Sequence, residues 1–125
     1  MIAGLHHVQV ACPPGGEQAA RGFYGDLLGM TEVAKPAALA ARGGVWFRSG
    51  TAEVHVGIEE PFRPAEKAHP AFTVAGVDGL DAVCARLRSA GVPAAPDTLL
   101  PGHRRAYVHD PFGNRLELLE PLGPE

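Results

Sequence analysis

The sequence has few cysteines and no long hydrophobic run, and each shortage excludes a class of protein. Cys12 and Cys84 lie far apart in apolar surroundings, so a CxxC metal or redox site is excluded and we expect two buried, reduced thiols. No segment approaches the roughly 18 apolar residues that a membrane-spanning helix needs. Residues 1–11 lack the basic start and the long apolar run of a signal peptide. We therefore expect a cytoplasmic protein without a membrane partner.

Charge of either sign is also sparse. Charged residues make up 20% of the 125 residues, the formal net charge is −3, and lysine and arginine are scattered rather than clustered. Because a nucleic-acid partner requires a basic surface, we do not expect one. What the chain has instead is 46% hydrophobic residues, 16 glycines and 12 prolines. This composition predicts a compact globular domain made of many short elements joined by tight turns.

The first half of the chain predicts a strand, a helix and three short strands. Apolar and polar residues alternate in the first strand, residues 5–11, and a Pro-Gly run ends it. In residues 17–28 apolar side chains recur at helical spacing, and Gly29 marks the end of the helix. The alanine-rich residues 37–41 either belong to the strand region or form an extra helical turn. The three strands are expected at residues 31–33, 44–48 and 53–58.

The second half repeats this pattern after a charged, proline-containing connection, residues 60–67. Residues 69–74 predict a strand, Asp78 is a good N-cap for the helix that follows, and Gly91 marks its end. Two further strands are then expected on either side of a turn at residues 110–114. Their predicted bounds are residues 106–109 and 115–120.

One offset of 62 residues relates the two halves at their potential metal ligands. It relates His7 to His69 and His55 to Glu117. The apolar faces of the two helices match at an offset of 60 instead, which requires a small length change in the flanking turns. Two copies of a unit that cannot bury its apolar face alone must pair. We therefore interpret residues 1–125 as a single domain of two modules, about residues 4–59 and 68–121.

Strand periodicity predicts that these four side chains can point into one cup. Neighbouring residues of a strand point to opposite faces, so Glu117 is opposed to its two leucine neighbours, which are expected to face a helix. The same rule opposes His7 and His55 to adjacent valines. A lone histidine on a strand is more often a hydrogen-bonded residue than a ligand. The matched positions nevertheless favour ligation for His7, His69 and Glu117 and leave His55 open between the two roles.

A divalent cation suits this set of donors. An imidazole or carboxylate among apolar neighbours is costly to bury unpaired, and one cation would satisfy several of them. Two or three imidazoles with a carboxylate suit Zn²⁺, Fe²⁺, Ni²⁺, Co²⁺ or Mn²⁺, and the absence of thiolate argues against a structural zinc site. The ligands do not choose among these metals. One ion per site, with open coordination positions, could bind paired substrate oxygens and stabilise an enolate, alkoxide or oxyanion.

Three motifs together make the chain resemble a known superfamily. They are Leu-His-His-Val-Gln-Val at residues 5–10, Phe-Tyr-Gly-Asp-Leu-Leu-Gly-Met at 23–30 and Asp-Pro-Phe-Gly-Asn-Arg-Leu-Glu at 110–117. The chain resembles, over nearly its whole length, the vicinal oxygen chelate superfamily of glyoxalase I, extradiol dioxygenases, and fosfomycin- and bleomycin-resistance proteins. The resemblance implies an α+β fold of two βαβββ modules that form a cupped mixed sheet. It also implies a homodimer with the site at the subunit interface.

The resemblance places metal ligands at His7, His69 and Glu117. In glyoxalase I a fourth ligand, commonly Glu, stands at the position of His55, so His55 is either a ligand or a group that handles protons. If His55 is a ligand, Glu117 can instead dissociate and act as a base. Extradiol dioxygenases share the set of two histidines and one glutamate, but their additional catalytic histidine and tyrosine have no assigned equivalents in this chain.

The leading hypothesis is a divalent-metal-dependent enzyme that acts on a small molecule chelated through oxygens, as an isomerase, lyase, dioxygenase or thiol transferase. Glu117 and His55 are its candidate catalytic residues. The alternative is a metal-free protein of the bleomycin-resistance type that binds or sequesters a small molecule or antibiotic. Such proteins typically lack the three ligands, which argues against this alternative. The candidate substrate-binding residues are Gln9, Trp46, His103, Arg104 and Tyr107.

Overall fold

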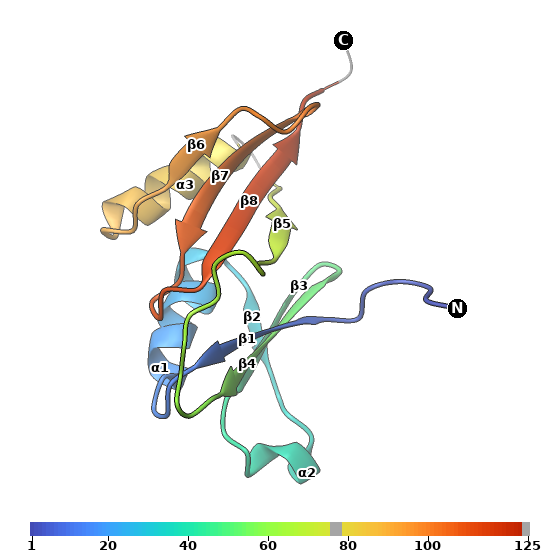
Figure 1. Cartoon of the computed structure of the whole chain (residues 1–125), viewed down its shortest axis with the longest axis vertical. Coiled ribbons are helices and arrows are strands. Elements are labelled where there is room, and N and C mark those ends of the chain that lie inside the picture. Colours follow the sequence, from blue (N-terminus) through green and yellow to red (C-terminus); the bar gives the residue numbers. More distant parts are fainter. Residues whose placement is uncertain (76–78, 124–125) are drawn as a thin grey trace. The chain divides into compact units, whose positions relative to one another are not determined.

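The structure is a computed structural model that describes residues 1–75 and 79–123. Its internal contacts divide the chain into an N-terminal unit, Met1–Ala65, and a C-terminal unit, Glu66–Glu125. Each unit contains one four-stranded sheet with both parallel and antiparallel strand pairs (Figure 1). The expected α+β architecture of two similar modules is therefore present.

The N-terminal unit has the strand order β1-β4-β3-β2. β1 runs parallel to β4, and the other neighbours are antiparallel. The alanine-rich segment forms a short helix, α2, which was one of the two expected outcomes. The elements are β1 Val8–Cys12, α1 Glu17–Ala20, η1 Arg21–Leu27, β2 Thr31–Val33, α2 Ala37–Ala40, β3 Val45–Ser49 and β4 Ala52–Ile58.

The helix predicted at residues 17–28 departs from a plain α-helix. Its first part, α1, is α-helical; η1 continues it as a π-helix, and the Leu28 N–H donates to the Phe23 carbonyl oxygen, five residues earlier, at 2.9 Å. Two glycines lie in η1, and their low helix propensity makes the departure less costly. Phe23 and Tyr24 are both buried, and η1 contacts β2 and β3. The predicted amphipathic helix therefore supplies part of the core of this unit.

The C-terminal unit repeats the same strand order, β5-β8-β7-β6, with β5 parallel to β8. The equivalence of the two sheets confirms the internal repeat that the sequence indicated. A longer helix, α3, packs against β7 and β8. The elements are β5 Ala71–Thr73, α3 Gly79–Ser89, β6 Ala95–Asp97, β7 His103–His109 and β8 Arg115–Pro121.

Several element bounds differ from the sequence predictions. β5 begins at Ala71 rather than at His69, because Pro70 has no N–H to donate; its carbonyl oxygen accepts a hydrogen bond from the Glu117 N–H at 3.0 Å. β6 was not predicted, since its three residues lie at a sheet edge and include Pro96. β1 begins only at Val8. The predicted N-cap, Asp78, lies outside the described residues.

The alternation of faces along the strands follows the prediction. Leu116 and Leu118 are 0% and 2% exposed, and α3 packs against their strand. In β4, Val54 and Val56 are 0% and 1% exposed. Because strand neighbours point to opposite faces, Glu117 lies on the sheet face opposite its leucine neighbours. The apolar core of each unit thus fixes the direction of the polar side chains between the core residues.

Both cysteines match their expected state. Cys12 and Cys84 are free and buried. Burial raises the pKa of the Cys84 thiol, which keeps it protonated and unreactive. Among the described helices, none combines the length and apolar character that crossing a bilayer requires.

The turn between β7 and β8 provides a stability test. Asp110 Oδ1 accepts hydrogen bonds from the N–H groups of Phe112 and Asn114 at 3.0 and 2.9 Å, and Oδ2 accepts one from Asn114 Nδ2 at 2.9 Å. Asp110→Ala is expected to lower the free energy of unfolding by about 2 kcal/mol, because buried donors lose their acceptor. Asp81→Ala, which removes an exposed carboxylate, is the control and should have a much smaller effect in urea unfolding. Equal effects would contradict this account of the turn.

Candidate metal centre

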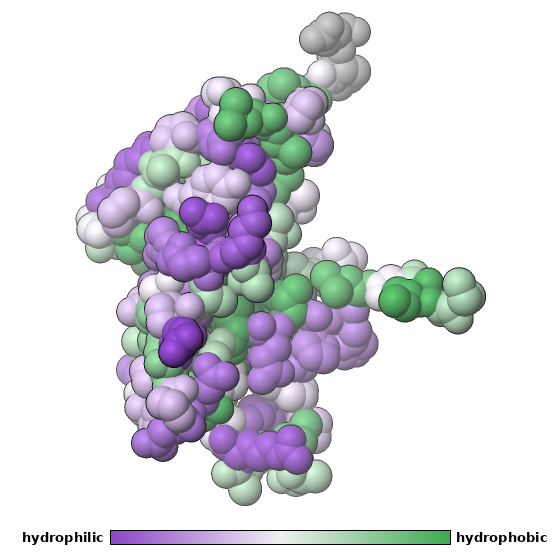
Figure 2. Space-filling model, viewed as in Figure 1, coloured by the Kyte–Doolittle hydropathy of each residue, from purple (hydrophilic) through white to green (hydrophobic). Residues whose placement is uncertain are grey.

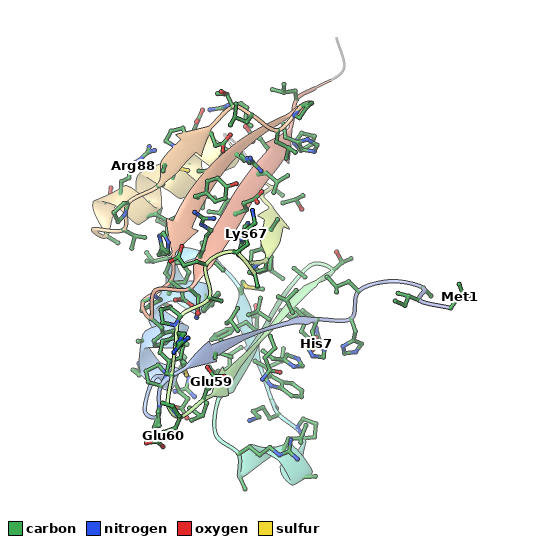
Figure 3. The ribbon with its side chains drawn as sticks, viewed as in Figure 1. Met1, His7, Glu59, Glu60, Lys67 and Arg88 are labelled. Atoms are coloured by element: carbon green, nitrogen blue, oxygen red, sulfur yellow. The ribbon has the colours of Figure 1, made fainter. Side chains whose placement is uncertain are left out.

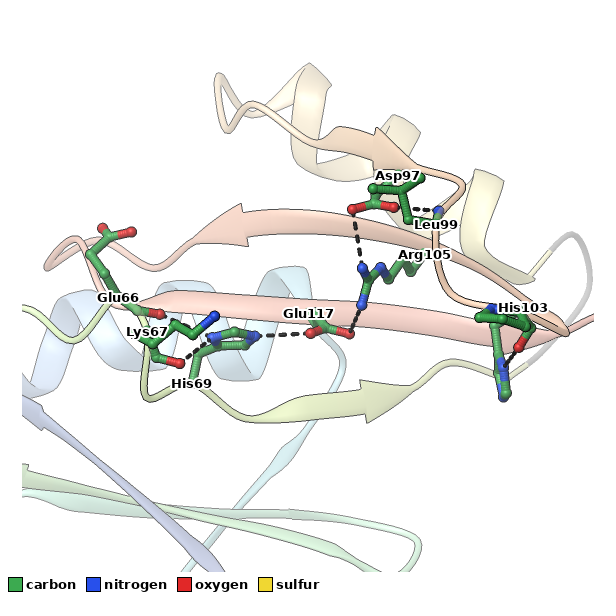
Figure 4. A network of polar contacts seen from close by, with 9 residues as sticks. Glu66, Lys67, His69, Asp97, Leu99, His103, Arg105 and Glu117 are labelled. Atoms are coloured by element: carbon green, nitrogen blue, oxygen red, sulfur yellow. Dashed lines mark hydrogen bonds and ion pairs between the residues drawn. The ribbon is translucent and has the colours of Figure 1, made fainter.

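In the C-terminal unit, His69 and Glu117 form a close pair. His69 Nε2 lies 2.9 Å from Glu117 Oε1, and the two side chains are 15% and 12% exposed (Figure 4). His69 precedes β5 and Glu117 lies in β8, where it is the register partner of Ala71. Parallel pairing of β5 with β8 therefore brings together two residues that are far apart in the sequence.

The other nitrogen of His69 determines what this pair can hold. Nδ1 lies 2.9 Å from the carbonyl oxygens of both Glu66 and Lys67. Both of these atoms are acceptors, so Nδ1 carries the hydrogen and donates. The lone pair of a neutral His69 ring then lies on Nε2 and faces the Glu117 carboxylate. Two electron-pair donors at this separation need a cation between them, either a proton or a metal ion.

Arg105 and Tyr107 complete this cluster. Tyr107 is the cross-strand partner of Glu117, and its ring makes an edge contact with His69 at a centroid distance of 5.8 Å. Arg105 Nη1 donates to Glu117 Oε2 at 3.3 Å. The guanidinium groups of Arg105 and Arg115 lie 5.1 and 4.9 Å from the Tyr107 ring centroid. Glu117 is thus contacted on both carboxylate oxygens.

In the N-terminal unit, His7 and His55 form the second pair. Their rings stack at a centroid distance of 3.9 Å, and Trp46 stacks on the other face of His55 at 3.7 Å. Trp46 is the cross-strand partner of His55, just as Tyr107 is of Glu117. His7 directly precedes β1, where the extended N-terminal segment joins the sheet (Figure 3). The stack spans three neighbouring segments of this unit.

One nitrogen of His55 is already engaged. Glu53 Oε2 accepts a hydrogen bond from His55 Nε2 at 2.7 Å, and Glu53 Oε1 accepts from Arg48 Nη2 at 2.8 Å. Hydrogen bonds from His55 and then Arg48 lower the pKa of Glu53 to about 2, so the carboxylate is ionised. His55 Nε2 is therefore the donor, and Nδ1 is the nitrogen that a neutral ring would offer to a metal ion.

His7 is also suited to ligation. Desolvation is the main cause that lowers its pKa, and the neighbouring His55 and His6 lower it further. A lowered pKa favours the neutral imidazole, which is the form that binds metal ions. His7 Nδ1 lies 2.9 Å from His6 Nδ1. The histidine pair of this unit and the His69–Glu117 pair thus offer nitrogen and oxygen donors of the kinds that Zn²⁺, Fe²⁺, Ni²⁺, Co²⁺ or Mn²⁺ accept.

Neither unit holds a complete set of ligands. Among residues 1–75 and 79–123, no three His, Cys, Asp or Glu side chains converge as a metal site would require. The predicted ligands instead occur as two pairs, one in each unit. The structure therefore brings together His7 with His55, and His69 with Glu117.

The remaining predicted site residues have different surroundings. Gln9 lies exposed in β1 opposite His55, and its side chain fills the space above Gly57. His103 Nδ1 donates to the Pro101 carbonyl oxygen at 3.0 Å at the start of β7. Arg104 bonds to Asp81 and Glu120 and so does not join the His69–Glu117 pair. The cationic side chain beside Glu117 is that of its neighbour, Arg105.

Sequence reasoning gave no site role to two residues that contact the predicted ligands: Arg105, which it placed in a solvated turn, and Glu53. Strand alternation carries a signal for Arg105, because Ala106 and Val108 are apolar and place Arg105 and Tyr107 together on the opposite face. The same alternation places Glu53 with His55. Neither pattern, however, shows which of these side chains contact one another.

A sequence model of the Glyoxalase/Bleomycin resistance protein/Dioxygenase superfamily matches residues 4–118. The chain belongs to this superfamily. No relative was found among curated proteins. Solved structures include a glyoxalase family protein from Bacillus anthracis, which is 46% identical with a TM-score of 0.90 over 98% of both chains.

More distant relatives share the fold at lower identity. A glyoxalase/dioxygenase from Nostoc punctiforme is 21% identical, with a TM-score of 0.77 over 96% of this chain and 92% of its own. The fosfomycin resistance protein FosX from Listeria monocytogenes, in a mutant form complexed with Mn(II) and 1S,2S-dihydroxypropylphosphonic acid, is 18% identical. Its TM-score is 0.77 over 98% of this chain and 95% of that protein. A protein with this fold therefore binds a divalent metal ion and a small oxygen-rich molecule.

Proposed function

We propose that this protein is a divalent-metal-dependent enzyme that acts on a small molecule chelated through oxygens. The ligands of the ion are His7, His55, His69 and Glu117. The observation that carries the proposal is the His69–Glu117 pair, in which the backbone fixes Nδ1 as a donor and leaves Nε2 at 2.9 Å from a carboxylate oxygen. Holding the second ring nitrogen in this way is typical of histidines that bind metal ions.

The chain's own residues would divide the work around the ion. A bound divalent metal supplies a Lewis acid that polarises a chelated oxygen. With His55 as a ligand, Glu117 is the group that would dissociate from the ion and hold or move a proton. Trp46 and Tyr107 offer aromatic faces next to the ligands, and Gln9 and His103 offer polar groups for substrate binding. Isomerase, lyase, dioxygenase and thiol transferase chemistry are all compatible with this arrangement.

We further propose that the active form is a homodimer and that each site takes one pair of ligands from each chain. The division of the ligands into two pairs supports this proposal, since neither unit holds three. A second support is the extended N-terminal segment, whose apolar surface is visible in Figure 2 and in which Met1, Ile2 and Leu5 are exposed. Apolar side chains this exposed favour burial against a partner, and the proposed partner is a second copy of the chain.

Metal analysis of purified protein tests the proposal directly. Wild-type protein is expected to hold about one divalent ion per chain. His69→Ala and Glu117→Ala should each lose more than about nine-tenths of it, because a site with a missing ligand binds far more weakly. His109→Ala removes an exposed histidine that pairs with Glu66 and is the matched control, expected to keep its metal. Elemental analysis of the wild type would also identify the metal.

A substrate screen with the metal-loaded protein then addresses the reaction class. Small diols, thiol adducts of 2-oxoaldehydes and phosphonates are suitable probes, since each presents paired oxygens to a metal ion. Wild-type protein that binds no divalent metal, and yet binds one of these molecules tightly, would overturn the enzyme proposal. It would favour the metal-free binding protein instead.

A further inference from the structure

Glu117 belongs to a chain of polar contacts that crosses the C-terminal sheet. Asp97 Oδ2 accepts a hydrogen bond from Arg105 Nη2 at 3.2 Å, and Arg105 Nη1 donates to Glu117 Oε2 at 3.3 Å (Figure 4). Glu117 Oε1 faces His69 Nε2 at 2.9 Å. These polar contacts thus join β6, β7, β8 and the segment before β5. Each of the four side chains comes from a different one of these segments.

Arg105 is held on both sides by these polar contacts. Its side chain is 15% exposed, and those of Asp97 and Glu117 are 17% and 12% exposed. Asp97 is itself anchored, since its Oδ1 accepts a hydrogen bond from the Leu99 N–H at 2.6 Å. The Tyr107 ring packs against the guanidinium group. Arg105 therefore reaches Glu117 from a fixed direction, and the Asp97 carboxylate balances its charge.

The repeat provides an internal comparison. Tyr107 lies opposite Glu117 in the C-terminal sheet, as Trp46 lies opposite His55 in the N-terminal sheet. Two residues before the aromatic side chain stands Arg105 in one unit and Gly44 in the other. Arg105 therefore places a cation beside the anionic ligand Glu117. Gly44, which has no side chain, occupies the equivalent position beside the imidazole ligand His55. This asymmetry ties Arg105 to the carboxylate of Glu117 rather than to the fold of the repeat.

We propose that Arg105, held by Asp97, is a positioning residue that keeps Glu117 in a one-oxygen mode of metal binding. With Oε2 bonded to Arg105, the carboxylate would offer only Oε1 to a bound ion. A coordination position that a two-oxygen carboxylate would fill would then be available to the substrate. This inference rests on the proposed function, because it concerns the ligand set of the same site. It adds a residue and a reason why Glu117 binds in a single orientation.

Metal affinity is the first measurement. Arg105→Gln is expected to raise the dissociation constant for Co²⁺ or Zn²⁺ by about 10- to 100-fold, which is the usual effect of removing a residue that orients a ligand. Arg105→Lys retains the charge but cannot bridge two carboxylates through a planar fork, so it should restore only part of the affinity. Arg104→Gln changes the neighbouring arginine, which bonds to Asp81 and Glu120, and should stay within about twofold of the wild type.

A spectroscopic measurement separates positioning from a general structural effect. The visible spectrum of the Co²⁺-loaded protein depends on the number and arrangement of the ligands, so the spectrum of Arg105→Gln is expected to differ from that of the wild type, because the Glu117 carboxylate is no longer held in one orientation. Thermal unfolding of each variant shows whether the fold is retained. Arg104→Gln should keep the wild-type spectrum.

The outcomes distinguish the two proposals. Wild-type protein that binds Co²⁺ tightly, together with an Arg105→Gln variant of equal affinity and unchanged spectrum, would overturn the role of Arg105 and leave the proposed function standing. An equal loss in Arg104→Gln would also overturn it, because the effect would then not depend on contact with Glu117. Wild-type protein without metal affinity would overturn the proposed function and this inference together.

Discussion

Mixing two metal-free variants of this chain is expected to restore metal binding. One variant carries His7→Ala and His55→Ala, and the other carries His69→Ala and Glu117→Ala. Each homodimer lacks a complete ligand set and should bind almost no divalent metal. If each site takes one pair from each chain, the heterodimer contains one site with all four ligands and one with none. It should therefore bind about one ion per dimer, at close to the wild-type affinity.

The experiment uses two affinity tags, co-expression of the two variants and purification of the doubly tagged species before metal analysis. The control for metal taken up without a complete site is a doubly tagged homodimer of each variant, in which the two copies of the same variant carry different tags. Doubly tagged wild-type protein defines full occupancy. A heterodimer that forms and stays metal-free would show that both pairs of a site come from one chain, and failure to recover any doubly tagged species would contradict the homodimer itself.

Replacing Gly44 is expected to destabilise the N-terminal sheet strongly. Gly44 has a φ of 86°, and a Cβ added at this position would lie well inside van der Waals contact with the Val56 carbonyl oxygen in β4. An L side chain in the left-handed region costs about 1–2 kcal/mol, and the overlap forces the backbone of β3 away from β4. Gly44→Ala should therefore lower the free energy of unfolding by more than about 3 kcal/mol in urea.

The hairpin that joins β3 to β4 offers a matched control. Gly50 also has a positive φ, 57°, but an added Cβ would meet no atom within 4 Å. Gly50→Ala should cost only the conformational term, about 1 kcal/mol. The difference between the two variants then measures the close approach of Gly44 to Val56. Equal losses would show that backbone conformation alone explains the requirement for glycine at position 44.

Much of the fold followed from local patterns. Alternation of apolar and polar residues predicted that Leu116 and Leu118 are buried while Glu117 points to the other face, and the core confirms this. Helical spacing predicted the two amphipathic helices, although it could not show the π-helical turn of η1. The short strand β6 escaped prediction because three residues with a proline carry almost no periodic signal.

The candidate site divides in the same way. The offset of 62 residues selects His7, His55, His69 and Glu117 from the sequence alone, because repetition and alternation are both visible along the chain. The residues that contact these four donors could not be identified from the sequence. The substrate-binding role of Arg104 stays a prediction, and sequence reasoning gave no site role to Arg105, which contacts Glu117, or to Glu53, which bonds to His55.

The sequence by itself determined most strands of the two sheets, which side chains leave the core, and which four donors correspond across the repeat. The tertiary structure alone decided the contacts among them: His69 with Glu117, Arg105 between Asp97 and Glu117, and Trp46 stacked on His55. The reason is physical. A side chain's face follows from the two-residue period of its own strand, but its partner depends on the order and register of strands that are distant in the chain.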